Sequence, residues 1–482
     1  MREKSHFRFN LLLLFTLVFL LSCAGGRSHR NPETTEQSPQ TKSTDQALSQ
    51  DPDPKKALGK QFLQAARKEF TFVKDPEIVT TVNQVGRRIL EGIGEDPSDY
   101  HFLIVKQNQA NAFAIPGGYI FIFDGLLSKL GSVDALAGVL AHEIAHITRN
   151  HHFKDAKKEG AINLATMAAV IGAVLAGKGE EAASVIAPAA NITLKLGFSR
   201  KNEEEADFFA IKYLQKTGYN PVGLSDFFKT LAFYKRFAGA PIPAYLSTHP
   251  GVEGRRAKVD AFLRNRSIKR KINPEVQDWG RLLTILRAEE GEEVDLSTDP
   301  SGKGQDALSE ERRHYLSGLF ALKSGRLKQA VREYREALRL HPDHPLYYAD
   351  LSWVYTRLGK ADLAREAALK SLQLSKEEAA PHAVLGMIAQ AEEHHEEAIE
   401  HLHAAITRSP NDPFLHLQMA QSLHALSMSV KEYFHLGRYY RLDLEPEKAL
   451  RQLNKARLKA EKESPLLKSI QREIREIQRE GI

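Results

Sequence analysis

The sequence predicts a mostly α-helical protein with a small β-sheet, arranged as a mixed domain followed by an α-solenoid. Two observations lead to this prediction. Helical periodicity, an H-E-x-x-H motif and short strand-like runs fill residues 55–272. Residues 309–462 repeat with a period of about 34, which is typical of stacked helix pairs. The length of 482 residues agrees with both, because it exceeds one ordinary domain.

The composition favours a folded protein without a nucleic-acid partner. With 42% hydrophobic and 27% charged residues, the chain has enough apolar material for a core. The formal net charge is +6, and its Lys and Arg residues are scattered rather than clustered. Since nucleic-acid binding needs a basic patch or stripe, we expect no such partner.

The N-terminus has the pattern of a secretory signal peptide. Arg2, Lys4 and Arg8 precede an uninterrupted apolar run at residues 11–21, which is too short to span a bilayer. This pattern predicts that residues 1–22 are a signal peptide removed on export.

Cys23, the single cysteine of the chain, directly follows the predicted signal peptide. The sequence Leu20-Leu21-Ser22-Cys23 resembles the bacterial lipobox, whose cysteine is acylated after cleavage. The resemblance implies a periplasmic protein anchored to the membrane through lipidated Cys23, and Ala24 in the next position favours the outer membrane. The alternative is an ordinary cleaved signal with an incidental cysteine. In either case residues 23–54, rich in Ser, Thr, Gln and Pro, predict a disordered tether.

The mixed domain is predicted to begin with two helices and continue with short strands before the motif. The helices are expected at residues 55–70 and 76–94, and the strands at 100–106 and 118–127, with a Pro-Gly-Gly turn between residues 111–115 and the last strand. The last strand contains YIFIF, whose alternation suggests an edge strand that a substrate could extend by β-augmentation. Ser132 is the expected N-cap of the helix that carries the motif.

The motif HEIAH indicates metal chemistry. His142 and His146 are four positions apart, so on a helix their side chains lie about 40° apart on one face. Two imidazoles at this spacing bind zinc, and the carboxylate of Glu143 beside them can act on a water molecule. A catalytic zinc also needs a third protein ligand. His152 has the spacing of the metzincin third ligand, but Arg149 replaces the glycine that lets that chain turn back, so we reject His152.

A second helical pattern, SRKNEEEADFFAIKYL, supplies carboxylates. Glu203 and Asp207 are i and i+4, on one face with small alanines that let another helix approach. Glu204 and Glu205 point away from that face and are expected to be solvated. An acidic first turn favoured by the helix dipole would explain the acidity but not this pair.

Together HEIAH, an E-x-x-A-D pattern within EEEAD, NAFAIPGGYIFIFDGLL and STHPGVEGRR resemble the M48 metallopeptidases over about residues 55–270. With the signal peptide and the repeats, the chain resembles the periplasmic, repeat-bearing members of that family. The resemblance implies a gluzincin-type domain with one Zn²⁺ per chain. His142, His146 and Glu203 would be the zinc ligands and Glu143 the catalytic base.

Three further residues have roles that stay open. Asp207 corresponds to a second catalytic carboxylate, often described as a proton donor, but it could equally accept a hydrogen bond from a zinc-binding histidine. His249 and Arg255 resemble the His-Pro-x-x-x-x-Arg element of the family. His249 could be a removable fourth zinc ligand, could stabilise the oxyanion, or could be a loop histidine without a role.

Two segments connect or cover the mixed domain. Residues 161–177 carry no charge but are shorter than the roughly 20 residues of a membrane span. We expect a small-residue helix packed over the catalytic domain rather than a membrane-dipping segment. Residues 273–308, which end in an acidic stretch rich in turn residues, are predicted to be a linker.

The region 309–462 is predicted to consist of tetratricopeptide repeats, with a polar-faced capping helix at 463–482. Three repeats are regular, and the fourth slips by seventeen residues and resumes at Leu436-Gly437. Four histidines of the repeats are expected to lie on a solvated helix face, because no carboxylate or cysteine framework accompanies them; they are His394, His395, His401 and His403.

The resemblance favours a zinc-dependent endopeptidase of the cell envelope that degrades unfolded or misassembled outer-membrane proteins. The repeats would dock a client or the outer-membrane protein assembly machinery. The alternative is a chaperone or scaffold for outer-membrane protein assembly with a mostly closed metal site.

Overall fold

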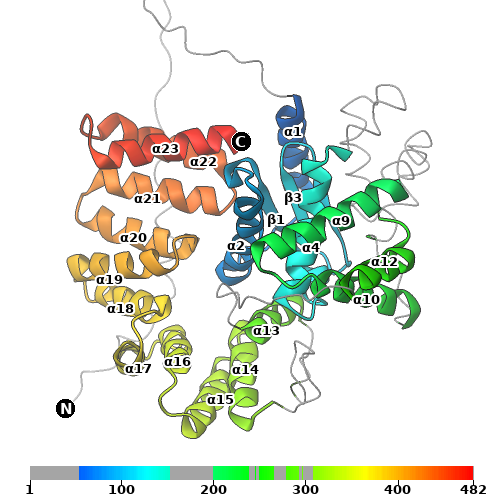
Figure 1. Ribbon diagram of the computed structural model, residues 1–482. Helices are drawn as coiled ribbons and strands as arrows, with labels where there is room; N and C mark the ends of the chain where they lie inside the picture. The colour runs from blue at the N-terminus through cyan, green and yellow to red at the C-terminus, as the bar shows by residue number, and fades with distance from the viewer. Residues whose placement is uncertain are drawn as a thin grey trace, which may run out of the picture. The chain divides into compact units, whose positions relative to one another are not determined.

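A three-stranded sheet forms the centre of the N-terminal domain (Figure 1). The computed structural model describes residues 54–151, 199–237, 245, 249–264, 278–291, 296 and 308–480. The strands are β1 (His101–Val105), β2 (Ala112–Ile115) and β3 (Tyr119–Phe123), in the order β1-β3-β2. Strand β3 runs parallel to β1 and antiparallel to β2. Gly117 and Gly118, both at positive φ, make the predicted turn between β2 and β3.

The expectation that YIFIF is an edge strand is wrong. These five residues are β3, the central strand, and all of them are buried. Their alternate side chains pack against α1 (Pro54–Glu69) on one face and against the core around α4 (Val133–Thr148) on the other. A strand covered on both faces needs no polar positions, so its sequence does not distinguish edge from centre. The edge next to the motif helix is β2.

The motif helix α4 is buried along almost its whole length. Ser132 is its N-cap, as predicted, and its hydroxyl accepts a hydrogen bond of 3.1 Å from the backbone N–H of Ala135. Every residue from Val133 to His146 is buried. Around α4 pack α2 (Pro76–Ile93), α9 (Arg200–Thr217) and α10 (Val222–Phe237), and α12 (Val252–Arg264) covers α9 and α10. Two short elements complete the domain, η1 (Pro97–Asp99) and α3 (Asp124–Leu127).

Several predicted segments lie outside the described residues. They are the signal peptide, the tether and the helix expected at 161–177. Within the ranges that the structure describes, no helix is both long and apolar enough to cross a membrane.

Part of the expected linker is a buried helix, α13 (Trp279–Glu290). Trp279 donates a hydrogen bond of 2.9 Å from its indole to the carbonyl of Leu130. Arg281 makes two hydrogen bonds of 2.7 Å to Glu77 on α2 and one of 2.5 Å to Asp350 in the repeats. The helix therefore fastens the start of the solenoid to the N-terminal domain. The expectation of a linker at residues 273–308 rested on the acidic, turn-rich stretch that follows this helix.

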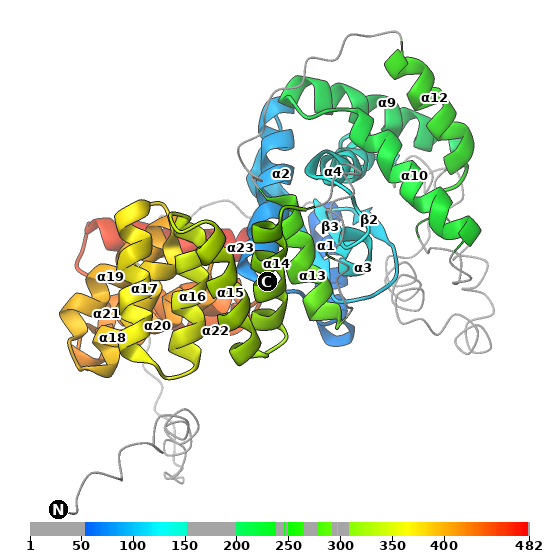
Figure 2. The same cartoon turned by 90° about the horizontal axis from the view of Figure 1, so that it is seen from below.

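The repeats form stacked antiparallel helix pairs (Figure 2). The helices are α14 (Glu310–Lys323), α15 (Leu327–Leu340), α16 (Pro345–Arg357), α17 (Ala361–Leu374), α18 (Ala379–Ala391), α19 (His395–Arg408), α20 (Pro413–Ala425), α21 (Ser429–Leu442), α22 (Pro446–Lys459) and α23 (Pro465–Glu480). The turn within each regular pair has a residue at positive φ, and these residues recur every 34 positions, at Gly325, Gly359, Glu393 and Ser427.

The predicted slip of seventeen residues has a structural cause. Helix α21 closes one pair with α20 and opens the next with α22. Leu444, seventeen positions after Ser427, takes the positive φ of the next turn. Gly437 lies against Leu453 as Gly386 lies against Leu402 in the regular repeat, so that the helices cross closely. The final helix α23 covers the open end of the stack with Ile470, Ile474 and Ile477.

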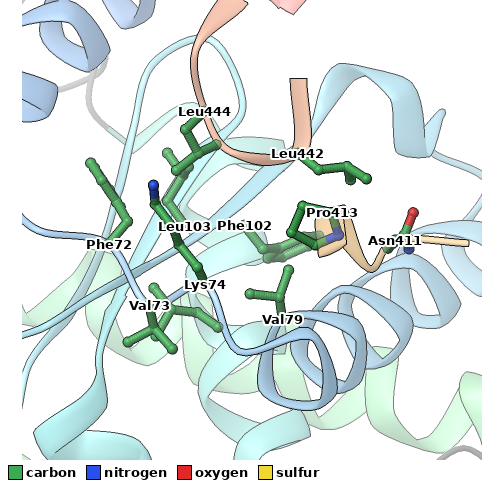
Figure 3. A pocket seen from close by; sticks show the side chains of 11 residues that line it. Phe72, Val73, Lys74, Val79, Phe102, Leu103, Asn411, Pro413, Leu442 and Leu444 are labelled. Atoms are coloured by element: carbon green, nitrogen blue, oxygen red, sulfur yellow. The ribbon is translucent and has the colours of Figure 1, made fainter. Parts of the chain in front are cut away.

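The far part of the solenoid also contacts the N-terminal domain, at a small apolar pocket (Figure 3). Leu442 and Leu444 line it from the solenoid, and Phe72 and Leu103 line it from the N-terminal domain. Beside it, Lys74 Nζ lies 2.7 Å from a carboxylate oxygen of Asp443.

Candidate metal centre

Helices α4 and α9 bring the predicted metal ligands together. His142 and His146 project from α4, Glu203 projects from the first turn of α9, and His249 comes from the segment before α12. All four side chains are fully buried, and one ligand atom from each lies within 4.8 Å of the others. The structure thus brings Glu203, the expected third ligand, next to the two histidines, together with His249, a candidate from the sequence for a removable fourth ligand.

The distances within this group suit a tetrahedral zinc ion. Nε2 of His142 and Nε2 of His146 are 3.0 Å apart, and each lies within 3.5 Å of a Glu203 oxygen. His249 Nδ1 lies 3.0 Å from Glu203 Oε1 and 3.5 Å from His142 Nε2. Nitrogen and oxygen ligands of zinc at about 2.0–2.1 Å would lie about 3.3 Å from one another. Three imidazoles and one carboxylate are also a usual donor set for zinc.

Glu143 lies beside the group without being a member of it. Its side chain is fully buried, and neither carboxylate oxygen has a hydrogen-bond partner among the described residues. Burial raises the pKa of Glu143. Nε2 of His249 lies 3.7 Å from its Oε1, and the backbone N–H of Ala114 on β2 acts in the opposite direction to burial and lowers the pKa. A buried carboxylate with unused acceptor oxygens is suited to take a proton from a molecule that enters the site.

Asp207 and Arg255 form a buried ion pair behind the ligands. Arg255 donates two hydrogen bonds of 2.7 Å to the two oxygens of Asp207 and also bonds to Glu203. Asp207 Oδ1 lies 3.0 Å from Nδ1 of His142. Burial opposes ionisation, but the charge of Arg255 lowers the pKa of Asp207 overall. These contacts favour the interpretation of Asp207 as the acceptor that orients His142, since a carboxylate that stays ionised is a poor proton donor.

Tyr245 and His249 connect the metal ligands to the residues just before β2. The backbone N–H of Tyr245 donates to the carbonyl of Ala110 at 3.4 Å, and His249 N donates to the carbonyl of Tyr245 at 2.8 Å. The two rings stack, with centroids 4.1 Å apart. These two residues therefore lie close to the strand edge that faces the site.

Two residues near the centre were missed by the sequence reasoning. His151 is fully buried and contacts His146, and Glu205, expected to be solvated, makes an ion pair with Arg149 at 2.8 Å. The rejected His152 lies outside the described residues. Glu204, also expected to be solvated, has a half-exposed side chain that forms an ion pair with Lys258 at the surface.

The repeat histidines are spread over different environments. His394 and His403 are exposed, whereas His395 and His401 are partly buried. Two pairs sit at equivalent positions of neighbouring repeats: His382 with His401 at 3.4 Å and His416 with His435 at 2.9 Å, both between Nδ1 atoms.

The fold and the centre define a metallopeptidase domain with an H-E-x-x-H helix and a glutamate ligand from a second helix, followed by an α-solenoid. Residues 78–262 match the model of peptidase family M48, and residues 271–429 match a model of the tetratricopeptide repeat. The chain therefore contains an M48 peptidase domain joined to tetratricopeptide repeats.

The chain is similar to named bacterial and mitochondrial peptidases. The chain is 28% identical over 239 residues to the beta-barrel assembly-enhancing protease of Yersinia pestis, covering 49% of this chain and 48% of that protein. It is 24% identical over 303 residues to the protein of that name from Escherichia coli K12, covering 61% of each. It is 28% identical over 190 residues to the mitochondrial metalloendopeptidase OMA1 of Schizosaccharomyces pombe, covering 39% of this chain and 54% of that protein. The matched part thus spans about half of these relatives.

Proposed function

We propose that the protein is a zinc-dependent endopeptidase of the cell envelope that cleaves unfolded or misassembled outer-membrane proteins. The observation that supports it most is the buried group of His142, His146, Glu203 and His249 with the unpartnered carboxylate of Glu143 beside it. The names of the relatives support the envelope role and the link to β-barrel proteins.

The chemistry divides between the metal and the chain's own residues. Zinc, when bound by His142, His146 and Glu203, supplies a Lewis acid for the peptide carbonyl and lowers the pKa of water to about 7. Glu143 takes the proton of the attacking water and passes it to the leaving amine. Asp207, held by Arg255, keeps the imidazole of His142 in the tautomer that leaves Nε2 free.

Strand β2 offers the place where a substrate backbone would lie. It is an edge strand and packs next to α4. An extended peptide added to it would be held mainly by main-chain hydrogen bonds, which are indifferent to side chains. Such binding suits a peptidase whose substrates are unfolded chains that differ in sequence.

Partners and location extend the same proposal. The repeats would dock clients or the outer-membrane assembly machinery, and lipidated Cys23 would hold the mature chain at the periplasmic face of the outer membrane. An envelope peptidase anchored there meets its clients where they assemble.

The test is cleavage of casein and of an unfolded β-barrel protein by wild type and by Glu143→Gln, with zinc content measured on both. We expect wild type to cleave, and the variant to keep zinc while losing turnover by roughly 10²–10⁴-fold, the usual contribution of a general base. Equal cleavage by both proteins, or loss of zinc from the variant, would contradict the proposal.

A second function, chaperone or scaffold, is favoured by one observation. His249 lies among the ligands, where a fourth protein ligand would exclude the attacking water. If this is the main function, Glu143→Gln should suppress aggregation of the unfolded barrel protein as well as wild type does, while neither protein cleaves it.

A further inference from the structure

A histidine that the peptidase chemistry does not use lies directly behind the metal ligands. His151 has no exposed surface. Its Nδ1 lies 3.0 Å from Nδ1 of His146, and its Nε2 lies 3.4 Å from Oε2 of Glu205 on α9. Glu205 accepts a hydrogen bond of 2.8 Å from Nε of Arg149. The three side chains connect the ligand His146 to a carboxylate at the protein surface.

The backbone after α4 turns in order to place this histidine. Helix α4 ends at Thr148, and Asn150 adopts a positive φ of 54°, a conformation that asparagine tolerates better than most residues. On a straight helix, position 151 would lie about 140° round the axis from His146. The turn at Asn150 instead brings His151 back against His146. Lys55 Nζ, 2.7 Å from the side-chain oxygen of Asn150, supports the turn.

The direction of each hydrogen bond follows from the position of the metal group. Nε2 of His146 faces that group, 3.0 Å from His142 and 3.4 Å from Glu203, so it must present a lone pair when metal is bound. The ring proton of His146 is then on Nδ1 and is donated to Nδ1 of His151. His151 then carries its own proton on Nε2, which lies 3.4 Å from Oε2 of Glu205. With both rings neutral, this is the order in which His146 donates to His151 and keeps Nε2 free for a metal.

The two zinc histidines are therefore oriented in different ways. Nδ1 of His142 is paired directly with a carboxylate, that of Asp207, at 3.0 Å. Nδ1 of His146 reaches a carboxylate through an intervening imidazole. Partners of this kind fix the tautomer and the ring angle of a ligand and raise its basicity, and removing one usually lowers metal affinity by about 10–100-fold.

We propose that His151 and Glu205 are positioning residues that orient His146 for zinc. The proposal rests on the proposed zinc site and deepens it, because it assigns the protein groups that set the affinity of one ligand. Arg149 holds Glu205 in place through a hydrogen bond of 2.8 Å from its Nε.

The test measures zinc affinity rather than cleavage. The full-length mature protein is stripped of metal and titrated with Zn²⁺ in competition with a chelator of known affinity. His151→Leu removes the acceptor at nearly constant volume and should weaken zinc binding by roughly 10–100-fold. His151→Gln can still accept from His146 and donate to Glu205, so it should restore most of the affinity. Glu204→Gln, one position from Glu205 on the exposed side of α9, is the matched control and should bind as wild type does.

Spectra and a milder variant separate positioning from a general loss of structure. The visible bands of the Co²⁺-loaded protein report ligand geometry, and they should change in His151→Leu and be restored in His151→Gln. If His151→Leu does not fold, Glu205→Gln at its partly exposed site should still lower affinity severalfold, because the neutral amide is a weaker acceptor. Wild-type affinity in both His151→Leu and Glu205→Gln would overturn the inference, whereas a wild type that binds no zinc would overturn the proposed function instead.

Discussion

His249 stands between Glu203 and Glu143: its Nδ1 lies 3.0 Å from a Glu203 oxygen, and its Nε2 lies 3.7 Å from a Glu143 oxygen. One imidazole thus faces the metal ligands with one nitrogen and the proposed base with the other. In this position His249 can occupy the coordination site that the attacking water needs. The contact between the Tyr245 backbone and Ala110, just before β2, suggests how a substrate on that edge could displace the segment.

We predict that His249→Ala raises basal cleavage of casein and keeps zinc, because three protein ligands remain and the fourth position opens. Self-cleavage in the segment from Gly291 to Ser309 should rise with it. If His249 stabilises the oxyanion instead, turnover should fall by roughly a hundredfold or more. The double variant with Glu143→Gln is the control, and activity that survives in it would come from a contaminating protease.

Glu203→Ala should release zinc, because its carboxylate is the only acidic member of the buried ligand group. His152→Ala should keep zinc, since the chain reaches a complete ligand set without it. The zinc content of both variants is measured after dialysis against a weak chelator. Glu204→Ala, at the exposed neighbouring position, is the control and should keep zinc. Equal zinc loss from the Glu203 and His152 variants would revive the metzincin arrangement.

Much of the site could be predicted because its geometry is local. A spacing of four residues places His142 and His146 on one face of α4, and Glu203 and Asp207 on one face of α9. The site then requires only that these two helix faces meet. The 34-residue period likewise fixes where each repeat turns, as the positive φ values at Gly359 and Glu393 confirm.

The parts that could not be predicted depend on contacts distant in sequence. Which of the three apolar strands is central depends on the order of strands in the sheet. The sequence YIFIF alone therefore does not show that β3 lies between β1 and β2. His151 reaches His146 only because Asn150 breaks the helical path, and Glu205 is held by Arg149, the residue that follows α4. Helix α13 is short, and it packs against α2 and α3 of the N-terminal domain and against α14 of the repeats.

Cys23→Ala should abolish lipid attachment, because the acceptor thiol is absent. Cells fed a palmitate analogue should label wild type only, and the unprocessed variant should keep residues 1–22. As a control, Ser22→Ala should remain labelled. Label on the Cys23 variant, or none on wild type, would contradict the lipid anchor and favour an ordinary cleaved signal peptide.

The repeats should lose stability on acidification through His416. Its side chain is 3% exposed, its Nε2–H donates to the carbonyl of Pro410, and its Nδ1 accepts from His435. Burial, helped by the charge of Arg438, lowers the pKa of His416 from 6.5 to about 4. Between pH 4 and pH 6.5, His416 is protonated in the unfolded chain but not in the folded chain. The free energy of unfolding is therefore at its full value above about pH 6.5 and decreases as the pH falls towards 4. Across that window the loss is about 3 kcal/mol at most.

The measurement is denaturant unfolding of the metal-free protein from pH 7 to about pH 4, followed by circular dichroism, so that zinc release does not contribute. His416→Gln should flatten the pH dependence relative to wild type, whatever its stability at pH 7, because a glutamine does not titrate. His394→Gln, at the exposed residue just before α19, should keep the wild-type slope. A slope in His416→Gln as steep as that of wild type would mean that this imidazole is already protonated in the folded repeat, with its partner His435 turned away.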